Sequence, residues 1–206
     1  EISDWIRKKT KDVLEVDNLE IDKDWQSYVV NALYFKGAWA EKFDSKNTKP
    51  EDFTGVTCNR KVPMMHNYDN YNYCEYGGFE AIELPYGNGD YVMTVMISKS
   101  EDRLSPEVMS GIVSAMKKEY ISLGFPKFET ETDISEFPIS LVKFDSFRHV
   151  AKINVDEEGT EAAAVTVIGD AAIAPNAPRE LIFNQPFYFV ITQKSTGVIL
   201  FVGYYC

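Results

Sequence analysis

The stretch Tyr28–Trp39, YVVNALYFKGAW, carries apolar side chains at both alternating sets of positions. Successive side chains of an extended strand point to opposite faces, so a stretch of this kind is typical of a strand that is covered on both faces. Such a strand needs sheet neighbours as well as covering elements. The stretch therefore predicts a fold that is organised around a large sheet.

Two helices and several further strands are expected around this stretch. An apolar stripe that includes Trp5 and Ile6 predicts an amphipathic helix over residues 2–14. Ser105-Pro106-Glu107 predicts the start of a second helix, with a capping hydroxyl, a proline and an acid in the first turn. Strands are expected at Glu80–Leu84, Tyr91–Ile97, Ile121–Phe128, Ile139–Phe147, Val150–Val155, Leu181–Ile191 and Val198–Tyr205. The fold class is therefore α+β, with antiparallel or mixed sheets.

One segment fits neither a helix nor a strand. Glu157–Ala164 is rich in helix-forming residues, yet it follows a strand and precedes Val165–Ile168, which favours β-structure. Gly169, Pro175 and Pro178 then indicate an exposed loop. A segment that has to adopt two conformations would have such a composition.

The composition excludes several classes of partner. A net charge of −11 would repel the phosphates of nucleic acid, and no apolar run approaches the ~20 residues that a membrane-spanning helix needs. The three cysteines, Cys58, Cys74 and Cys206, have no metal-like spacing and are expected to be isolated thiols. We therefore expect no nucleic-acid partner, no membrane partner, no metal and no cofactor.

The residues needed for catalysis are not found together. The two histidines, His66 and His149, are not placed near a serine in a nucleophile pattern. Glu157 and Glu158 are neighbouring acids, but no partner base is evident. The chain is therefore not expected to be an enzyme.

Four blocks of sequence, in this order along the chain, resemble the serpin family. The block Val155–Ala164 resembles the hinge of inhibitory serpins, with its acids, Gly-Thr-Glu and alanines. The others are Asn31–Trp39, Lys61–Met65, and Phe183–Phe187 followed by Leu200–Gly203. The chain is thus similar to the C-terminal half of a serpin, a single domain over residues 1–206 that is incomplete at its N-terminal side.

The resemblance implies a function as well as a fold. The fold would be a partial serpin fold with covering helices and an exposed reactive loop at about residues 157–180. A serine protease would cleave this loop as a suicide substrate, and the cut loop would insert into the main sheet and trap the acyl-enzyme. A non-inhibitory serpin that acts as a carrier or chaperone is the alternative, and a β-rich extracellular binding protein is a second one.

The hinge that the resemblance assigns consists of Glu157, Glu158, Gly159, Thr160, Glu161, Ala162, Ala163 and Ala164. If the inserted strand alternates with a period of two, Thr160, Ala162 and Ala164 would face the core side of the sheet, and Glu161 and Ala163 would face outward. Small inward side chains can pass between strands without displacing packed neighbours. This composition favours an inhibitory over a non-inhibitory serpin.

The resemblance also assigns a set of gate residues that control insertion. Asn31 and His149 match a pair that hydrogen-bonds between central strands. Trp39 and Lys127, together with Glu157, match a cluster at the top of the sheet, where the loop first enters. The ordinary alternatives are a core amide, a core histidine, a packed indole and surface ions.

Counting forward from the hinge places the scissile bond between Ile173 and Ala174. Counting back from Phe183 leads to Pro175 instead, but proline there would be a poor protease substrate. The small aliphatic side chains of residues 171–174 suit a serine protease with a small apolar pocket, of elastase or subtilisin type. Arg179 lies too far along to be a trypsin-type bait.

Two departures from the family pattern bear on the organisation of the chain. It begins at a late helix, so the printed sequence is not expected to bury Tyr28–Trp39 by itself. Separately, the complete protein is expected to be an extracellular or cell-envelope monomer, with an intracellular location left open. Ile134 runs directly into Ser135, where serpins carry a helix and a connecting loop. We therefore expect a gap in the chain at residues 134–135.

Overall fold

The computed structural model describes residues 2–10, 24, 27–100, 103–134, 146–160 and 178–206. The chain forms two compact units, which are described separately. The first consists of Glu1–Lys36 and Glu129–Asn154, and the second of Gly37–Phe128 and Val155–Cys206. The expected gap falls at Ser135, outside the described residues, and it remains a prediction, as does the single serpin domain.

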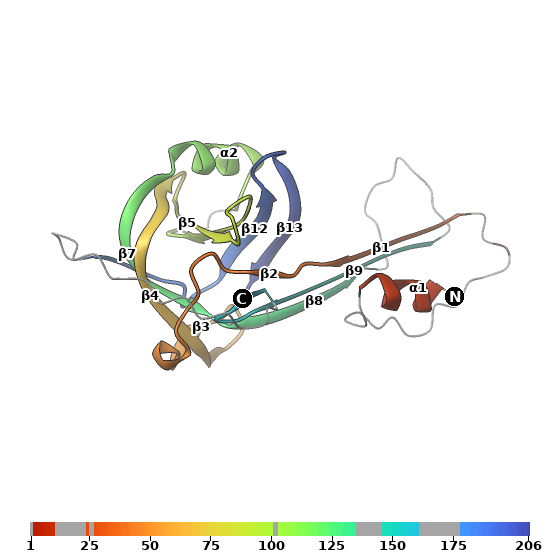
Figure 1. Cartoon of the computed structure of the whole chain (residues 1–206), viewed down its shortest axis with the longest axis horizontal. Helices are drawn as coiled ribbons and strands as arrows, with labels where there is room; N and C mark the ends of the chain where they lie inside the picture. Colours follow the sequence, from red (N-terminus) through yellow and green to blue (C-terminus); the bar gives the residue numbers. More distant parts are fainter. Residues whose placement is uncertain (1, 11–23, 25–26, 101–102, 135–145, 161–177) are drawn as a thin grey trace. The chain divides into compact units, whose positions relative to one another are not determined.

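Three long strands form the sheet of the first unit (Figure 1). Strand β1 (Tyr28–Tyr34) lies parallel to β9 (Ser146–Val155), and β8 (Phe128–Ile134) also pairs with β9. The strand expected at the start of Tyr28–Trp39 is thus confirmed. Its described side chains are half-buried, apart from the exposed Asn31, so the described residues do not bury this strand on both faces.

Helix α1 (Ile2–Lys9) packs on this sheet through one side chain. Ile6 is fully buried and packs in one cluster with Val150, Val30 and Ala32, whereas Trp5 on the neighbouring position is 50% exposed. The helix that the apolar stripe predicted is confirmed over the residues that the structure describes. Positions 11–14 of the prediction lie outside them.

The second unit is built on a mixed sheet in the order β11-β7-β4-β5-β6-β12-β13, with β3 beside β4. Most neighbours are antiparallel, while β11 and β7 are parallel. The sheet is strongly curved, as Figure 1 shows. Its strands are β3 (Lys49–Thr54), β4 (Asn59–Tyr76), β5 (Phe79–Tyr86), β6 (Tyr91–Ser98), β7 (Lys117–Pro126), β11 (Arg179–Ile182), β12 (Phe187–Gln193) and β13 (Val198–Tyr205).

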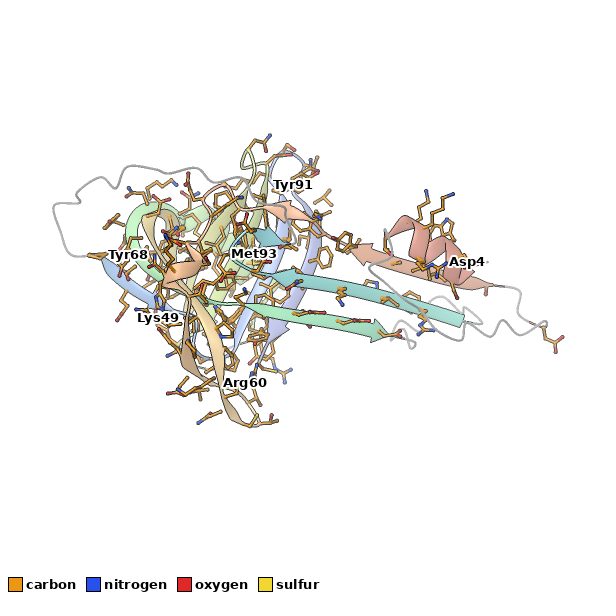
Figure 2. The ribbon with its side chains drawn as sticks, turned by 60° about the horizontal axis from the view of Figure 1, so that its bottom comes forward. Asp4, Lys49, Arg60, Tyr68, Tyr91 and Met93 are labelled. Atoms are coloured by element: carbon orange, nitrogen blue, oxygen red, sulfur yellow. The ribbon has the colours of Figure 1, made fainter. Side chains whose placement is uncertain are left out.

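Strand β4 is 18 residues long and contacts three neighbours in succession. It pairs first with β3, then with β7 over Met64–Tyr73, and finally with β5 over Asn72–Tyr76. Figure 2 shows Arg60 near one end of this strand and Tyr68 well along it. Strand β4 therefore connects β3, β7 and β5 within one sheet.

Residues 86–90 form the hairpin turn between β5 and β6. Gly87 and Gly89 adopt positive φ angles of 49° and 85°, and the Gly89 N–H donates to the Tyr86 carbonyl at 2.7 Å. Glycine is the residue that adopts these angles without strain.

Helix α2 (Pro106–Ala115) begins where the sequence predicts. The Ser105 hydroxyl accepts the Val108 N–H at 3.2 Å, and Ile112 is fully buried against Cys74 and Phe79 of the sheet. The helix closes one end of the curved sheet (Figure 1). None of the helices in the described part of the chain is long and apolar enough to cross a membrane.

Aromatic rings fill the other part of the core. Phe125 lies at the centre, with ring centroids 6.0 Å from Phe128, 5.7 Å from Phe183 and 5.7 Å from Phe187. Such edge-to-face and tilted pairs add about 0.5–1.5 kcal/mol each to the burial of the rings. This core holds the strands that follow the hinge segment, and so fixes the far end of the expected loop.

Candidate functional site

The hinge begins with a tight reversal of the chain at Asp156–Gly159. The Asp156 N–H donates to the Gly159 carbonyl at 2.9 Å, and the Gly159 N–H to the Asp156 carbonyl at 3.3 Å. The Asp156 carboxylate also accepts the N–H groups of Glu158 and Gly159, at 2.8 and 3.2 Å. An aspartate that bonds to the backbone two and three residues ahead is a common way of closing such a turn. The chain therefore reverses directly after β9.

After the turn, Gly159 and Thr160 form a short strand, β10 (Gly159–Thr160), which lies antiparallel to β2 (Gly37–Ala38). Thr160 also pairs with Val155, the last residue of β9. The Trp39 N–H donates to the Glu158 carbonyl at 3.0 Å and extends this pairing. The first residues of the hinge are thus already part of a sheet.

Only glycine fits at position 159. Its φ angle is 142°, and an added Cβ would lie 2.2 Å from the Gly37 carbonyl oxygen and 2.7 Å from the Ala38 Cα. Both contacts are to backbone atoms, which cannot rotate away. The structure therefore explains the glycine of the hinge by close approach of two strands as well as by backbone conformation.

Thr160 is fully buried, and its hydroxyl lies 2.8 Å from the Tyr86 hydroxyl. Tyr86 is itself 3% exposed, and burial raises the pKa of its phenol, so it stays neutral. Thr160 is thus buried at this position, and its orientation in an inserted strand stays a prediction. Glu161, Ala162, Ala163 and Ala164 lie outside the described residues, and so do the expected bait residues Ile173 and Ala174.

Trp39 connects the turn to the sheet behind it. Its indole N–H donates to the Asp156 carbonyl at 2.9 Å, and its ring stacks on Tyr86 with the centroids 4.4 Å apart. Only 4% of Trp39 is exposed. The indole is therefore packed and is also bonded to the turn at the hinge, and its role as a gate residue stays a prediction.

The two hinge acids that the structure describes, Glu157 and Glu158, form ion pairs. Glu157 binds Lys127 at 2.6 Å and accepts the Thr48 hydroxyl at 2.7 Å, while Glu158 pairs with Lys42. Partial burial opposes ionisation of Glu157, but the bonds from Lys127 and Thr48 outweigh it and lower its pKa. Lys127 and Glu157 are thus brought together as the resemblance implied.

In the first unit, Asn31 and His149 stand opposite each other on the parallel strands β1 and β9. The Asn31 amide nitrogen lies 3.1 Å from His149 Nδ1, so the amide donates to the ring when that nitrogen carries no proton. Asn31 is exposed and His149 is half-buried in this chain. The expected hydrogen-bonded pair is present, and neither residue is a core residue here.

The other end of the expected loop is held at β11. Arg179 binds Glu119 through Nε at 2.7 Å and Glu75 through a terminal nitrogen at 2.6 Å, and its guanidinium lies 5.0 Å from the Tyr73 ring centroid. These ion pairs raise the pKa of Arg179, the bond from Glu119 most, despite some desolvation. Arg179 is therefore an anchor of β11.

Sequence reasoning missed Thr48, Lys42 and Tyr86, and it included Asp156 in the hinge motif without giving it a role. An aspartate three residues before a glycine is a turn signal that would have indicated Asp156. No local pattern marks the others, because they reach the hinge from distant segments. Across the described residues, no group of three His, Cys, Asp or Glu side chains could hold a metal ion.

Comparison with known proteins agrees with this arrangement. The sequence model of the family described as Serpin (serine protease inhibitor) matches residues 1–139 and 132–206. An uncharacterized serpin-like protein of Methanosarcina mazei is 30% identical, over 98% of this chain and 55% of its own length. Human Serpin B4 is 29% identical, over 98% of this chain and 61% of its own length. The chain thus spans little more than half of these relatives.

Solved structures share the fold. The thermophilic serpin tengpin in its native state matches with a TM-score of 0.83 and 22% identity, over 98% of this chain and 61% of tengpin. Human thyroxine-binding globulin in complex with its ligand matches with a TM-score of 0.83 and 20% identity, over 98% of this chain and 62% of its own. With the family model matching both of its parts, the chain belongs to the serpin family.

Proposed function

We propose that the protein carrying this chain is an inhibitory serpin, which traps a serine protease by inserting its cleaved loop into a sheet. The observation that carries this proposal is the position of β10. Gly159 and Thr160 pair with Ala38 and Gly37 on one side, and Thr160 pairs with Val155 on the other. The hinge therefore starts where an additional strand would begin.

The residues after Thr160 have the composition that insertion requires. The inward positions that follow are Ala162 and Ala164, whose side chains are small. A fully inserted loop would form about a dozen new ladder hydrogen bonds, each contributing about 1 kcal/mol. A gain of this size supports a large and irreversible change after cleavage.

Insertion would be opposed by the pairing of β1 with β9. The two strands are in register from Tyr28 with Ser146 to Tyr34 with Lys152, and Asn31 bonds to His149 within this ladder. A strand that extends the hinge would have to separate them. We propose that the Asn31–His149 pair is the contact that sets when this ladder opens.

We propose cleavage between Ile173 and Ala174 by an elastase-like or subtilisin-like protease. The side chains on both sides of this bond are small or aliphatic, which suits a small apolar specificity pocket. Arg179 is engaged with Glu75 and Glu119, which supports its role as an anchor instead of a bait. We further propose an extracellular or cell-envelope location and a monomeric state for the complete protein.

The test is to incubate the full-length protein with such a protease and to resolve the products on a denaturing gel. A trapped acyl-enzyme appears as a band of higher mass that withstands detergent and boiling. Cleavage without this band would identify a substrate and refute inhibition. N-terminal sequencing of the released C-terminal peptide then shows whether it begins at Ala174.

A matched pair of variants tests the insertion step. Ala162→Arg places a charge at an expected inward position, and burial of an unpaired charge costs several kcal/mol, so the variant should be cleaved without trapping. Ala163→Arg makes the same change at an expected outward position and should still trap. Equal trapping by both variants would contradict the insertion model.

A non-inhibitory serpin is the second candidate. Thyroxine-binding globulin, which shares the fold with a TM-score of 0.83, was solved with a bound small molecule, so the fold also serves carriers. The gel assay separates the two candidates, because a carrier forms no covalent complex.

A further inference from the structure

A pocket of about 310 Å³ lies in the second unit, where β4 and β5 separate. The two strands pair from Asn72 with Glu83 to Tyr76 with Phe79, and beyond Asn72 and Glu83 they diverge. Strand β4 continues against β7, whereas β5 continues against residues 38–40, with the Ala40 N–H donating to the Pro85 carbonyl at 2.8 Å. The pocket lies in the space between the two diverging strands. Tyr68, labelled in Figure 2, directly precedes the part of β4 that lines it.

Three buried aromatic side chains form part of the pocket wall. Trp39, Phe43 and Tyr71 line it, and each is only 4–5% exposed. The rings of Trp39 and Phe43 stand at 74° to each other with their centroids 6.4 Å apart, so they form a corner. Concave pockets that combine aromatic side chains with polar groups are common small-molecule sites. The volume is at the lower end of that class.

The polar groups of the pocket favour a positively charged ligand. Three carboxylates line it, on Glu41, Asp69 and Glu83, against two ammonium groups. Lys194 binds Glu83 at 2.7 Å, so these two charges offset each other. The carboxylates of Glu41 and Asp69 then remain against the ammonium of Lys118, which donates to the Asn70 carbonyl at 2.9 Å.

The negative charges of Asp69 and Glu41 act on Tyr71 in the pocket wall. Burial is the main cause of the raised pKa of Tyr71, and the negative charges of Asp69 and Glu41 raise it further. The aromatic faces and the chain charge of −11 attract cations in addition.

We propose that this pocket binds a small organic cation with an apolar or aromatic group, and that its binding holds the hinge turn in place. The second part follows from the hydrogen bonds of the pocket wall. Trp39 donates its indole N–H to Asp156 and its backbone N–H to Glu158, and the Phe43 N–H donates to the Glu157 carbonyl at 3.0 Å. A ligand that fixes Trp39 and Phe43 therefore fixes the turn that they hold. The consequence for inhibition, slower loop insertion, rests on the proposed function.

Binding is tested with the full-length protein and benzyltrimethylammonium as the probe, by calorimetry and by the shift in thermal unfolding. Phenylacetate, which is aromatic and negatively charged, is the comparison ligand. The proposal expects saturable binding of the cation and at least tenfold weaker binding of the anion. Equal or tighter binding of phenylacetate would show that the lysines determine the preference, and would overturn the proposal.

Two pairs of variants locate the site. Asp69→Asn should weaken binding of the cation about threefold to tenfold, while Asp52→Asn, which removes the same charge from an exposed pair with Lys61, should leave it unchanged. Tyr71→Leu should weaken binding to a similar extent, whereas Tyr71→Phe, which keeps the ring, should not. The site is refuted if Asp69→Asn and Asp52→Asn behave alike.

Coupling to the hinge is measured by amide hydrogen exchange, which does not depend on inhibition. Saturating benzyltrimethylammonium should slow exchange of the Trp39 and Phe43 amides, because these N–H groups are bonded to hinge carbonyls. The Val198 amide, which bonds within the turn before β13, serves as the control and should not change. Unchanged exchange at Trp39 and Phe43 in the saturated protein would overturn the coupling. A protein that binds the probe but traps no protease would refute the proposed function and leave the site standing.

Discussion

Replacing Gly159 by alanine should weaken the attachment of the hinge to β2. The backbone at this position has a φ of 142°, where a side chain adds about 1–3 kcal/mol of strain. The new Cβ would also meet the Gly37 carbonyl oxygen at 2.2 Å, and forcing atoms into a packed region costs about 1–3 kcal/mol more. Together the two effects lower the free energy of unfolding by about 2–6 kcal/mol. The larger loss of stability is expected only if β10 stays paired with β2, because a detached β10 would avoid the contact with Gly37.

Gly197→Ala is the matched control for this change. Gly197 also has a positive φ, of 71°, but a Cβ there would meet no atom within 4 Å, so only the backbone strain of about 1–2 kcal/mol applies. Urea unfolding followed by circular dichroism measures both variants against the parent protein. Tryptophan fluorescence in the absence of urea reports on Trp39, whose indole is bonded to Asp156, and should change in Gly159→Ala only. Equal losses of stability in the two variants would refute the steric argument at position 159.

Three further predictions concern the hinge and the continuity of the chain. Thr160→Val, which removes a buried hydroxyl bonded to another hydroxyl, should lower the free energy of unfolding by about 1 kcal/mol, whereas Thr196→Val on the surface should change it by less than about 0.5 kcal/mol. The lowered pKa of Glu157 means that its ionised form stabilises the fold above its ordinary pKa, and that this contribution is lost as the pH falls through the lowered value. The difference in stability between the parent and Glu157→Gln should therefore shrink from about pH 7 to about pH 3, and a constant difference would contradict the assignment. A gap after Ile134 predicts that trypsin digestion of the protein releases no peptide Phe128–Lys143 of the printed sequence; its detection by mass spectrometry would show that the chain is continuous there.

Local patterns were sufficient for part of the fold. The hairpin between β5 and β6 and the start of α2 follow from residues that are neighbours in sequence, because glycines and a capping serine determine the backbone by themselves. The strand at Tyr28–Tyr34 was also predictable from its apolar pattern. Its partner β9, by contrast, lies more than a hundred residues away, and local residues do not encode which strands pair.

The residues of the candidate site could likewise be predicted only in part from the sequence. The resemblance to serpins indicated Gly159, Thr160, Trp39 and the Asn31–His149 pair, whose contacts the structure shows and whose roles stay predictions. It did not indicate Tyr86, which reaches Thr160 across 74 residues, because a tyrosine at the end of a strand has many possible partners. Long-range side-chain contacts of this kind depend on the packed fold.

The place of β12 in the sheet determines what happens to the molecule once the loop is cut. This strand lies between β6 and β13 and is bonded to each of them along its whole length. A cut at any bond within residues 161–177 therefore severs the covalent chain but leaves its last segment bonded to the rest of the sheet through β12 and β11. The two pieces should travel through a sizing column as one particle, and they should part only in denaturant.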